Sequence, residues 1–129
     1  AGEVRPEMVE VVRRCGERLH TALLTNNVVT MRAEAMAGAP PGDASPVAEV
    51  LALFDVIVES SVVGVRKPEP RFYEIACERL GIEPSEAVFL DDLGVNLKPA
   101  KAMGMTTIKV VDPAAAIAEL EQVVGFPLR

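Results

Sequence analysis

The chain has 129 residues, of which 50% are hydrophobic, and it carries a formal net charge of −6. This composition excludes a disordered chain, and an acidic balance without a dense lysine or arginine cluster argues against nucleic-acid binding. No apolar run reaches the ~20 residues of a membrane span, no signal peptide is visible and the two cysteines stand apart, so we expect a cytoplasmic protein with no membrane partner.

Hydrophobic periodicity predicts helices and strands that alternate along the chain. Apolar residues recur at helical spacing in some stretches and run together as short buried strands in others. Residues 28–45, around a Pro-Pro-Gly stretch, are predicted to form a long loop. The predicted helices cover 6–19, 46–54, 71–80, 96–103 and 113–124, and the predicted strands cover 20–25, 55–59, 87–91 and 105–111.

Proline and glycine mark the ends of several of these elements. Residues 64–70 contain two prolines, and because a residue before proline avoids the helical region, we expect an extended loop there. Gly81 is placed to end one helix in a left-handed conformation, and Asp112 is placed as the N-cap of the last helix. Pro99 is expected in the first turn of its own helix.

Strands that alternate with helices in this way form a parallel sheet with helices on both faces. We therefore predict an α/β fold with a doubly wound parallel sheet, in a single domain over residues 1–129. The carboxyl ends of parallel strands meet at one edge of such a sheet, where these folds bind their ligands.

Polar side chains gather at this predicted edge. A hydroxyl, an amide, an ammonium and a pair of carboxylates suit a phosphoryl group held beside Mg²⁺, because carboxylates bind the metal and the other groups bind phosphate oxygens. Each of them alone also has an ordinary structural interpretation, as a strand-end cap, a solvated lysine or a helix N-cap. The residues are Thr25, Asn26, Lys67, Asp91, Asp92 and Asn96.

Three segments resemble sequence motifs of one family. Residues 23–27 (Leu-Leu-Thr-Asn-Asn), 65–70 (Val-Arg-Lys-Pro-Glu-Pro) and 88–100, which begin Val-Phe-Leu-Asp-Asp-Leu-Gly, resemble motifs two, three and four of the haloacid dehalogenase (HAD) superfamily. The resemblance is strongest to the phosphatase-like amino-terminal domains of soluble epoxide hydrolases and of a multidomain acyl-CoA dehydrogenase. It implies a HAD-like, Rossmann-like core.

The resemblance also implies roles for the candidate residues. The phosphate-binding residues would be Thr25, Asn26 and Lys67. Asp91 would be the partner of Lys67 in catalysis, and Asp92 would be the Mg²⁺ ligand. Asn96 would orient the site as an outer partner.

One part of the family pattern is missing. The first motif of the family is a strand that ends in Asp-x-Asp and carries the nucleophile, and no Asp-x-Asp occurs in this sequence. The helical cap domain that follows this motif is missing as well. In the family the missing strand lies at the centre of the sheet, between the strands that here end at Thr25 and Asp91. The chain therefore resembles the carboxyl-terminal part of a HAD core, in which Mg²⁺ is weakly bound or absent.

The missing strand leads to a structural prediction. We expect the sheet to close up, so that the strand ending at Asp91 pairs directly with the strand ending at Thr25, or to borrow a strand from another chain by self-association. An open slot would leave two buried strand edges unpaired, which is costly. A third option is a missing amino-terminal segment.

The leading functional hypothesis is a HAD-type hydrolase. The complete protein would be a Mg²⁺-dependent phosphatase, with dehalogenation less favoured, that acts on a small phosphorylated substrate through an aspartyl-phosphate. The chain alone would be inactive, since it has no nucleophile. An alternative is a shortened pseudo-phosphatase that serves as a binding or regulatory domain. A phospho-acceptor receiver domain is disfavoured, because it places its acidic pair before its Thr and Lys, and here that order is reversed.

Overall fold

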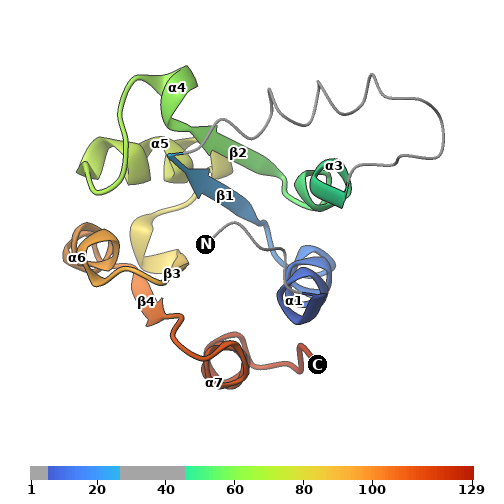
Figure 1. The fold of residues 1–129 in the computed structure, drawn as a ribbon. Coiled ribbons are helices and arrows are strands. Elements are labelled where there is room, and N and C mark those ends of the chain that lie inside the picture. Colours follow the sequence, from blue (N-terminus) through green and yellow to red (C-terminus); the bar gives the residue numbers. More distant parts are fainter. Residues whose placement is uncertain (1–5, 27–45) are drawn as a thin grey trace, which may run out of the picture.

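The computed structural model describes residues 6–26 and 46–129 (Figure 1). The predicted loop over 28–45 lies outside these residues. No helix in the described ranges has the length and apolar character needed to cross a membrane. The helices are α1 (Pro6–Gly16), α3 (Pro46–Leu51), α4 (Ser60–Val63), α5 (Pro70–Leu80), α6 (Gly94–Met103) and α7 (Pro113–Val124), with a 3₁₀ turn, η1, at Pro84–Glu86. The strands are β1 (Ala22–Thr25), β2 (Val56–Glu59), β3 (Val88–Asp91) and β4 (Thr106–Lys109).

The strands form two parallel pairs. β1 pairs with β2, with Thr25 opposite Glu59, and β3 pairs with β4, with Asp91 opposite Lys109. The predicted α/β fold with parallel strands is confirmed. Within residues 6–26 and 46–129, however, no ladder joins β1 to β3. The expectation that the sheet closes up is therefore wrong, while strand borrowing from another chain stays a prediction.

Helices pack on both faces of the strands, and on one face they connect the two strand pairs. On one face, Leu24 of β1 and Phe89 of β3 pack against the same apolar cluster, which includes Tyr73 of α5 and Ala100 of α6. On the other face, α1 packs against α7, and their cluster also takes in residues of β3 and β4. Figure 1 shows α6 to the left of the strands and α1 to the right. The core therefore continues across the gap between the strand pairs.

Several element boundaries differ from the predictions, most clearly at the start of α6. α6 begins at Gly94, so Pro99 lies inside the helix and not in its first turn. The Leu93 N–H donates to Oδ1 of Asp91 at 2.9 Å, which turns the chain into the helix directly after β3. A short helix, α4, follows β2 without having been predicted, and it ends at Gly64 with φ 79°.

The loop before α5 is a turn as well as an extended segment. The Glu69 N–H donates to the Arg66 carbonyl at 2.7 Å, so the predicted extended conformation holds for only part of residues 64–70. The two predicted caps are confirmed. Gly81 ends α5 with φ 70°. The Asp112 side chain accepts the Ala115 N–H at 3.3 Å at the start of α7.

Candidate functional site

Lys67 joins the carboxyl ends of two strands that do not pair with each other. Its main chain is held by Asn26, just after β1, since the Lys67 N–H donates to Asn26 Oδ1 at 3.0 Å and Asn26 Nδ2 donates to the Lys67 carbonyl at 3.3 Å. Its Nζ reaches Oδ2 of Asp91, the last residue of β3, at 2.9 Å. The ends of β1 and β3 therefore meet at one edge, and the pairing of Lys67 with Asp91 that the resemblance implies is present.

Asp91 carries a largely enclosed carboxylate at this edge. Its side chain is 6% exposed, against 15% for Lys67. Besides Lys67, it accepts the Leu93 N–H at 2.9 Å and the Asn96 amide at 3.3 Å. Burial acts to raise the pKa of Asp91, but the Leu93 N–H and the Lys67 ammonium outweigh burial and hold the pKa below its usual value. Asp91 is therefore ionised at neutral pH.

Tyr73 supports this arrangement from α5, and the sequence does not predict it. Its hydroxyl donates to the Asn96 carbonyl at 2.6 Å, and both residues are buried. Burial, and then the negative charge of Asp91, raise the pKa of Tyr73 to about 12. The phenol thus stays protonated and keeps donating. Tyr73 is the only tyrosine of the chain, and nothing in the sequence around it marks it as a site residue.

Thr25 and Glu59 form the buried part of the same edge. They are register partners at the ends of β1 and β2, and they are 7% and 4% exposed. Glu59 is a second residue that the sequence does not single out. Its signal is an acid directly after the apolar run Val-Ile-Val, which is the pattern that identifies Asp91. Three strand ends therefore bring polar side chains to this edge.

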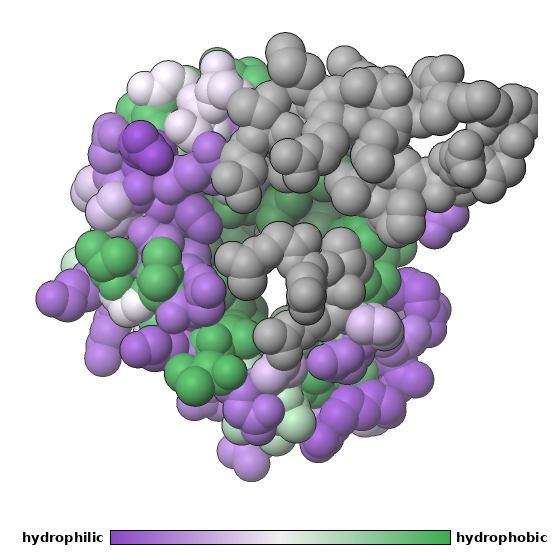
Figure 2. Space-filling model, viewed as in Figure 1, coloured by the Kyte–Doolittle hydropathy of each residue, from purple (hydrophilic) through white to green (hydrophobic). Residues whose placement is uncertain are grey.

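The surface beside Asp92 is apolar. Asp92 itself is exposed, and the next residues along the chain include Leu93 and Val95, which are 53% and 56% exposed. Figure 2 shows hydrophobic surface on the left, where Figure 1 places α6.

The described residues do not make up a Mg²⁺ site by themselves. Mg²⁺ takes about six oxygen ligands in octahedral geometry. Both oxygens of Asp91 already accept hydrogen bonds, which leaves Asp92 as the exposed carboxylate of the pair. In residues 6–26 and 46–129, no group of three or more His, Cys, Asp or Glu side chains meets that could hold a metal ion. The Asp91–Asp92 pair is part of a metal site at most.

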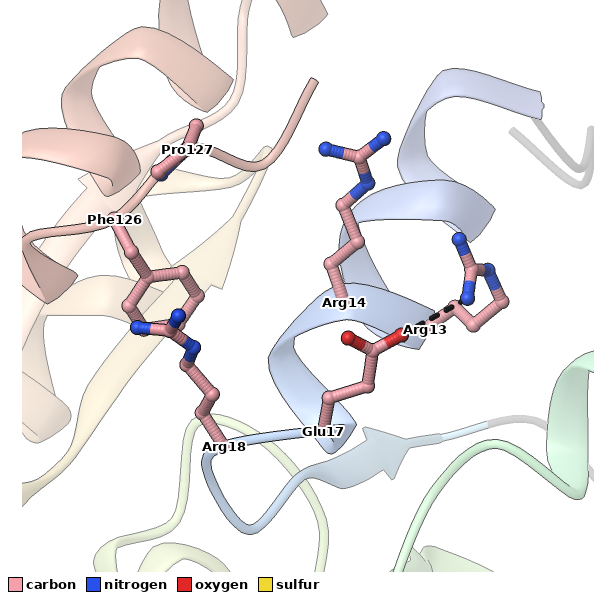
Figure 3. A pocket seen from close by; sticks show the side chains of 6 residues that line it. All are labelled: Arg13, Arg14, Glu17, Arg18, Phe126 and Pro127. Carbon is pink, nitrogen blue, oxygen red and sulfur yellow. Dashed lines mark hydrogen bonds and ion pairs between the residues drawn. The ribbon is translucent and has the colours of Figure 1, made fainter.

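A separate pocket lies between the end of α1 and the carboxyl-terminal segment (Figure 3). The Arg18 guanidinium lies 4.7 Å from the centroid of the Phe126 ring. Arg13 is paired with Glu17 at 3.0 Å, and Arg14 donates to the Arg129 carbonyl at 2.9 Å. α1 precedes β1, so this pocket is at the amino end of the strand and is distinct from the Lys67 edge. Its volume is about 300 Å³, and its lining residues are Arg13, Arg14, Glu17, Arg18, Phe126 and Pro127.

Sequence comparison connects the chain with hydrolases. Residues 1–104 match the family model of the haloacid dehalogenase-like hydrolases. The chain is 43% identical to acyl-CoA dehydrogenase family member 10 of Mus musculus over 97% of the chain and 11% of that protein. It is 54% identical to bifunctional epoxide hydrolase 2 of Rattus norvegicus over 57% of the chain and 14% of that protein. Further relatives carry the name phosphatase, among them a sesquiterpene phosphatase of Aspergillus oryzae. The chain thus spans a small part of the length of its first curated relatives.

Structure comparison leads to the same fold. A HAD family enzyme of Bacteroides thetaiotaomicron, in complex with magnesium and inorganic phosphate, superposes with a TM-score of 0.64 at 24% identity. The superposition covers 82% of this chain and 52% of that enzyme. At this identity the likeness shows the fold alone. Together with the match of the family model over residues 1–104, it leads to the conclusion that the chain belongs to the haloacid dehalogenase-like hydrolases.

Proposed function

We propose that the chain forms the carboxyl-terminal part of the catalytic core of a Mg²⁺-dependent phosphatase. In the complete protein, an Asp oxygen outside this chain attacks the phosphorus of a small phosphorylated substrate, and the bond from phosphorus to the leaving oxygen breaks. Water then cleaves the aspartyl-phosphate and releases phosphate. The observation that carries this proposal is the Lys67–Asp91 ion pair at the edge where β1 and β3 end.

In this proposal Lys67 supplies the positive charge that a phosphoryl group needs. Its ammonium neutralises phosphate oxygens, and the ionised Asp91 keeps it charged and oriented. Thr25, buried at the end of β1, is proposed to contact the phosphate. The Asn26 side chain is hydrogen-bonded to the Lys67 main chain, so Asn26 is proposed to contribute by positioning Lys67. Asn96 holds Asp91 from α6.

The proposed reaction of the complete protein requires Mg²⁺. Asp92 is its proposed ligand in this chain, because its carboxylate is exposed at the edge next to Asp91. A bound Mg²⁺ would offset the negative charge of the phosphoryl group. The magnesium and phosphate bound by the Bacteroides thetaiotaomicron enzyme, which has a similar fold, support the proposal that the complete protein uses Mg²⁺.

The first experiment uses the chain alone. We expect no hydrolysis of p-nitrophenyl phosphate with Mg²⁺ present, because no Asp-x-Asp strand supplies the nucleophile. Mg²⁺-dependent hydrolysis that rises with chain concentration and disappears in Lys67→Met would show that the chain has a nucleophile of its own and that its proposed inactivity is wrong.

The second experiment uses the complete protein. Lys67→Met is expected to lower kcat by roughly 10²- to 10³-fold, the usual effect of removing one group that stabilises transition-state charge. The matched control is Lys109→Met, since Lys109 is exposed on β4 opposite Asp91 and is expected to leave kcat within about twofold. Equal activity of both variants would contradict the role of Lys67.

A regulatory function is the second candidate, because no Asp-x-Asp occurs in the 129 residues. The gene sequence upstream of Ala1 distinguishes the two. An Asp-x-Asp strand encoded there favours the phosphatase, and a start codon close to Ala1 favours a pseudo-phosphatase that binds without turnover.

A further inference from the structure

The pocket between the end of α1 and the carboxyl-terminal segment carries an excess of positive charge (Figure 3). Its lining contains three arginines and a single acid, Glu17, although the whole chain has a formal net charge of −6. Glu10 adds a second carboxylate beside the lining, because it pairs with both Arg13 and Arg14. Three guanidinium groups against two carboxylates leave one positive charge in excess. The pocket is therefore suited to an anion.

Two of the three arginines are largely occupied by contacts within the chain. Arg13 lies between two acids, since its Nε donates to Glu10 at 3.0 Å and its Nη1 pairs with Glu17 at 3.0 Å. Arg14 donates from Nε to Glu10 at 3.2 Å and from Nη1 to the Arg129 carbonyl at 2.9 Å. Among the residues that the structure describes, Nη2 of Arg14 has no hydrogen-bond partner. One N–H group of Arg14 is therefore available to a ligand.

Arg18 offers the most available guanidinium group. It follows the end of α1 and lies 4.7 Å from the centroid of the Phe126 ring, and it makes no ion pair within residues 6–26 and 46–129. Stacking on an aromatic face orients a guanidinium and leaves the N–H groups at its edge free to donate. Figure 3 shows Phe126 and Pro127 on the other side of the pocket from α1. The pocket therefore has a charged side and an apolar side.

We propose that this pocket binds a small organic anion, in which one carboxylate or phosphate group is attached to a flat apolar body. The anionic group accepts hydrogen bonds from Arg18 and from Nη2 of Arg14 and neutralises the excess charge. The flat body lies against Phe126 and Pro127. The volume of about 300 Å³ is at the lower end for ligand pockets, so the ligand has the size of one substituted ring. This binding goes beyond the proposed phosphatase function, because the pocket is distinct from the Lys67 edge.

The experiment is a titration of the ¹⁵N-labelled chain with phenyl phosphate and, separately, with benzoate at constant ionic strength. We expect the amide signals of Glu17, Arg18 and Phe126 to shift, with a dissociation constant of about 1 mM or lower. The tighter of the two probes identifies the anionic group as phosphate or carboxylate. Benzyl alcohol has the ring without the charge, and inorganic phosphate has the charge without the ring. Each of these two is expected to bind at least about tenfold more weakly.

Three variants test the roles of the charges. Arg18→Met keeps an unbranched apolar side chain without the charge and is expected to weaken binding at least about tenfold. Glu17→Gln removes a negative charge from the lining and is expected to tighten binding about two- to threefold, a gain that damage to the fold would not produce. Arg79→Met is the matched control, since Arg79 is exposed on α5 and is expected to leave binding unchanged.

A fourth variant separates this pocket from the proposed phosphatase site. Lys67→Met is expected to leave the shifts of Glu17, Arg18 and Phe126 and the affinity measured from them unchanged, even if the proposed phosphatase function is wrong. Shifts confined to Asn26 and Lys67 would assign the probe to the Lys67 edge and overturn the proposal. Equal affinity of Arg18→Met and the wild type, equal binding of benzyl alcohol or inorganic phosphate, or no shift at millimolar probe would each overturn it as well.

Discussion

Replacing Lys67 with methionine tests whether the ion pair organises the site. The substitution keeps the side-chain length and removes the charge that faces Asp91 at 2.9 Å. Removing one partner of a fully buried ion pair costs about 3–5 kcal/mol. Asp91 keeps the Leu93 N–H and the Asn96 amide, and Lys67 is 15% exposed, so the lower end applies. We expect the free energy of unfolding at neutral pH to fall by about 3 kcal/mol.

The loss of stability caused by Lys67→Met is expected to depend on pH. The pKa of Asp91 lies below its usual value in the folded chain, so ionised Asp91 stabilises the fold above the unfolded pKa of about 3.9. This stabilisation is lost as the pH falls through the folded pKa. Lys67 is one of the groups that lower that pKa. In acid, where Asp91 is protonated, Lys67→Met therefore removes a weaker interaction. The difference between the wild type and the variant should therefore narrow below about pH 4.

The assay is urea unfolding followed by far-ultraviolet circular dichroism, for Lys67→Met, Asp91→Asn and the double variant. We expect a coupling energy above about 1 kcal/mol between the two sites. Lys109→Met is the control for loss of a positive charge and is expected to change the free energy of unfolding by less than about 0.5 kcal/mol. A loss for Lys67→Met no larger than that of Lys109→Met, or a loss independent of pH, would refute the reasoning.

Three more predictions follow from individual contacts. Tyr73→Phe removes the donor to the buried Asn96 carbonyl and is expected to lower the free energy of unfolding by about 1–3 kcal/mol, whereas an unchanged value would show that this hydrogen bond contributes nothing. Asp112→Ala removes the N-cap of α7 and should cost about 1 kcal/mol in thermal unfolding, with Asp112→Asn close to wild type as the control. Burial raises the pKa of the Cys15 and Cys77 thiols, so a thiol reagent should label them at least about tenfold more slowly in the folded chain than in urea, and equal rates would argue against their burial.

The sequence predicts which polar residues lie at the carboxyl edge of the strands, because each of them is marked by its immediate neighbours in the chain. Thr25 and Asp91 each follow a short apolar run, and parallel strands necessarily bring such ends together. Tyr73 escapes prediction for the opposite reason. The partner of its hydroxyl is the carbonyl of Asn96, and the meeting of α5 with α6 depends on the packing of the whole molecule. The start of α6 also depends on a side chain, because Asp91 binds the Leu93 N–H.

The wrong expectation about the sheet has a physical cause. It assumes that the facing edges of β1 and β3 are buried, so that unpaired backbone groups would be too costly. In the structure every residue of β3 keeps part of its surface exposed, so water can reach this strand. The α5–α6 layer packs on both strand pairs and holds them in place. Strand pairing therefore depends also on how the helices pack, and the spacing of apolar residues does not predict that packing.

The contact between α1 and α7 has a consequence for synthesis. Val11 and Cys15, on α1, are 3% and 8% exposed, and they share a cluster with Ile117 and Leu120 of α7. α1 is the first described helix of the chain and α7 is the last. During translation the apolar face of α1 therefore leaves the ribosome long before its partner exists. Folding of this core is completed only after α7 has emerged. Until then the apolar face of α1 stays exposed, and such exposed apolar surface is what chaperones bind.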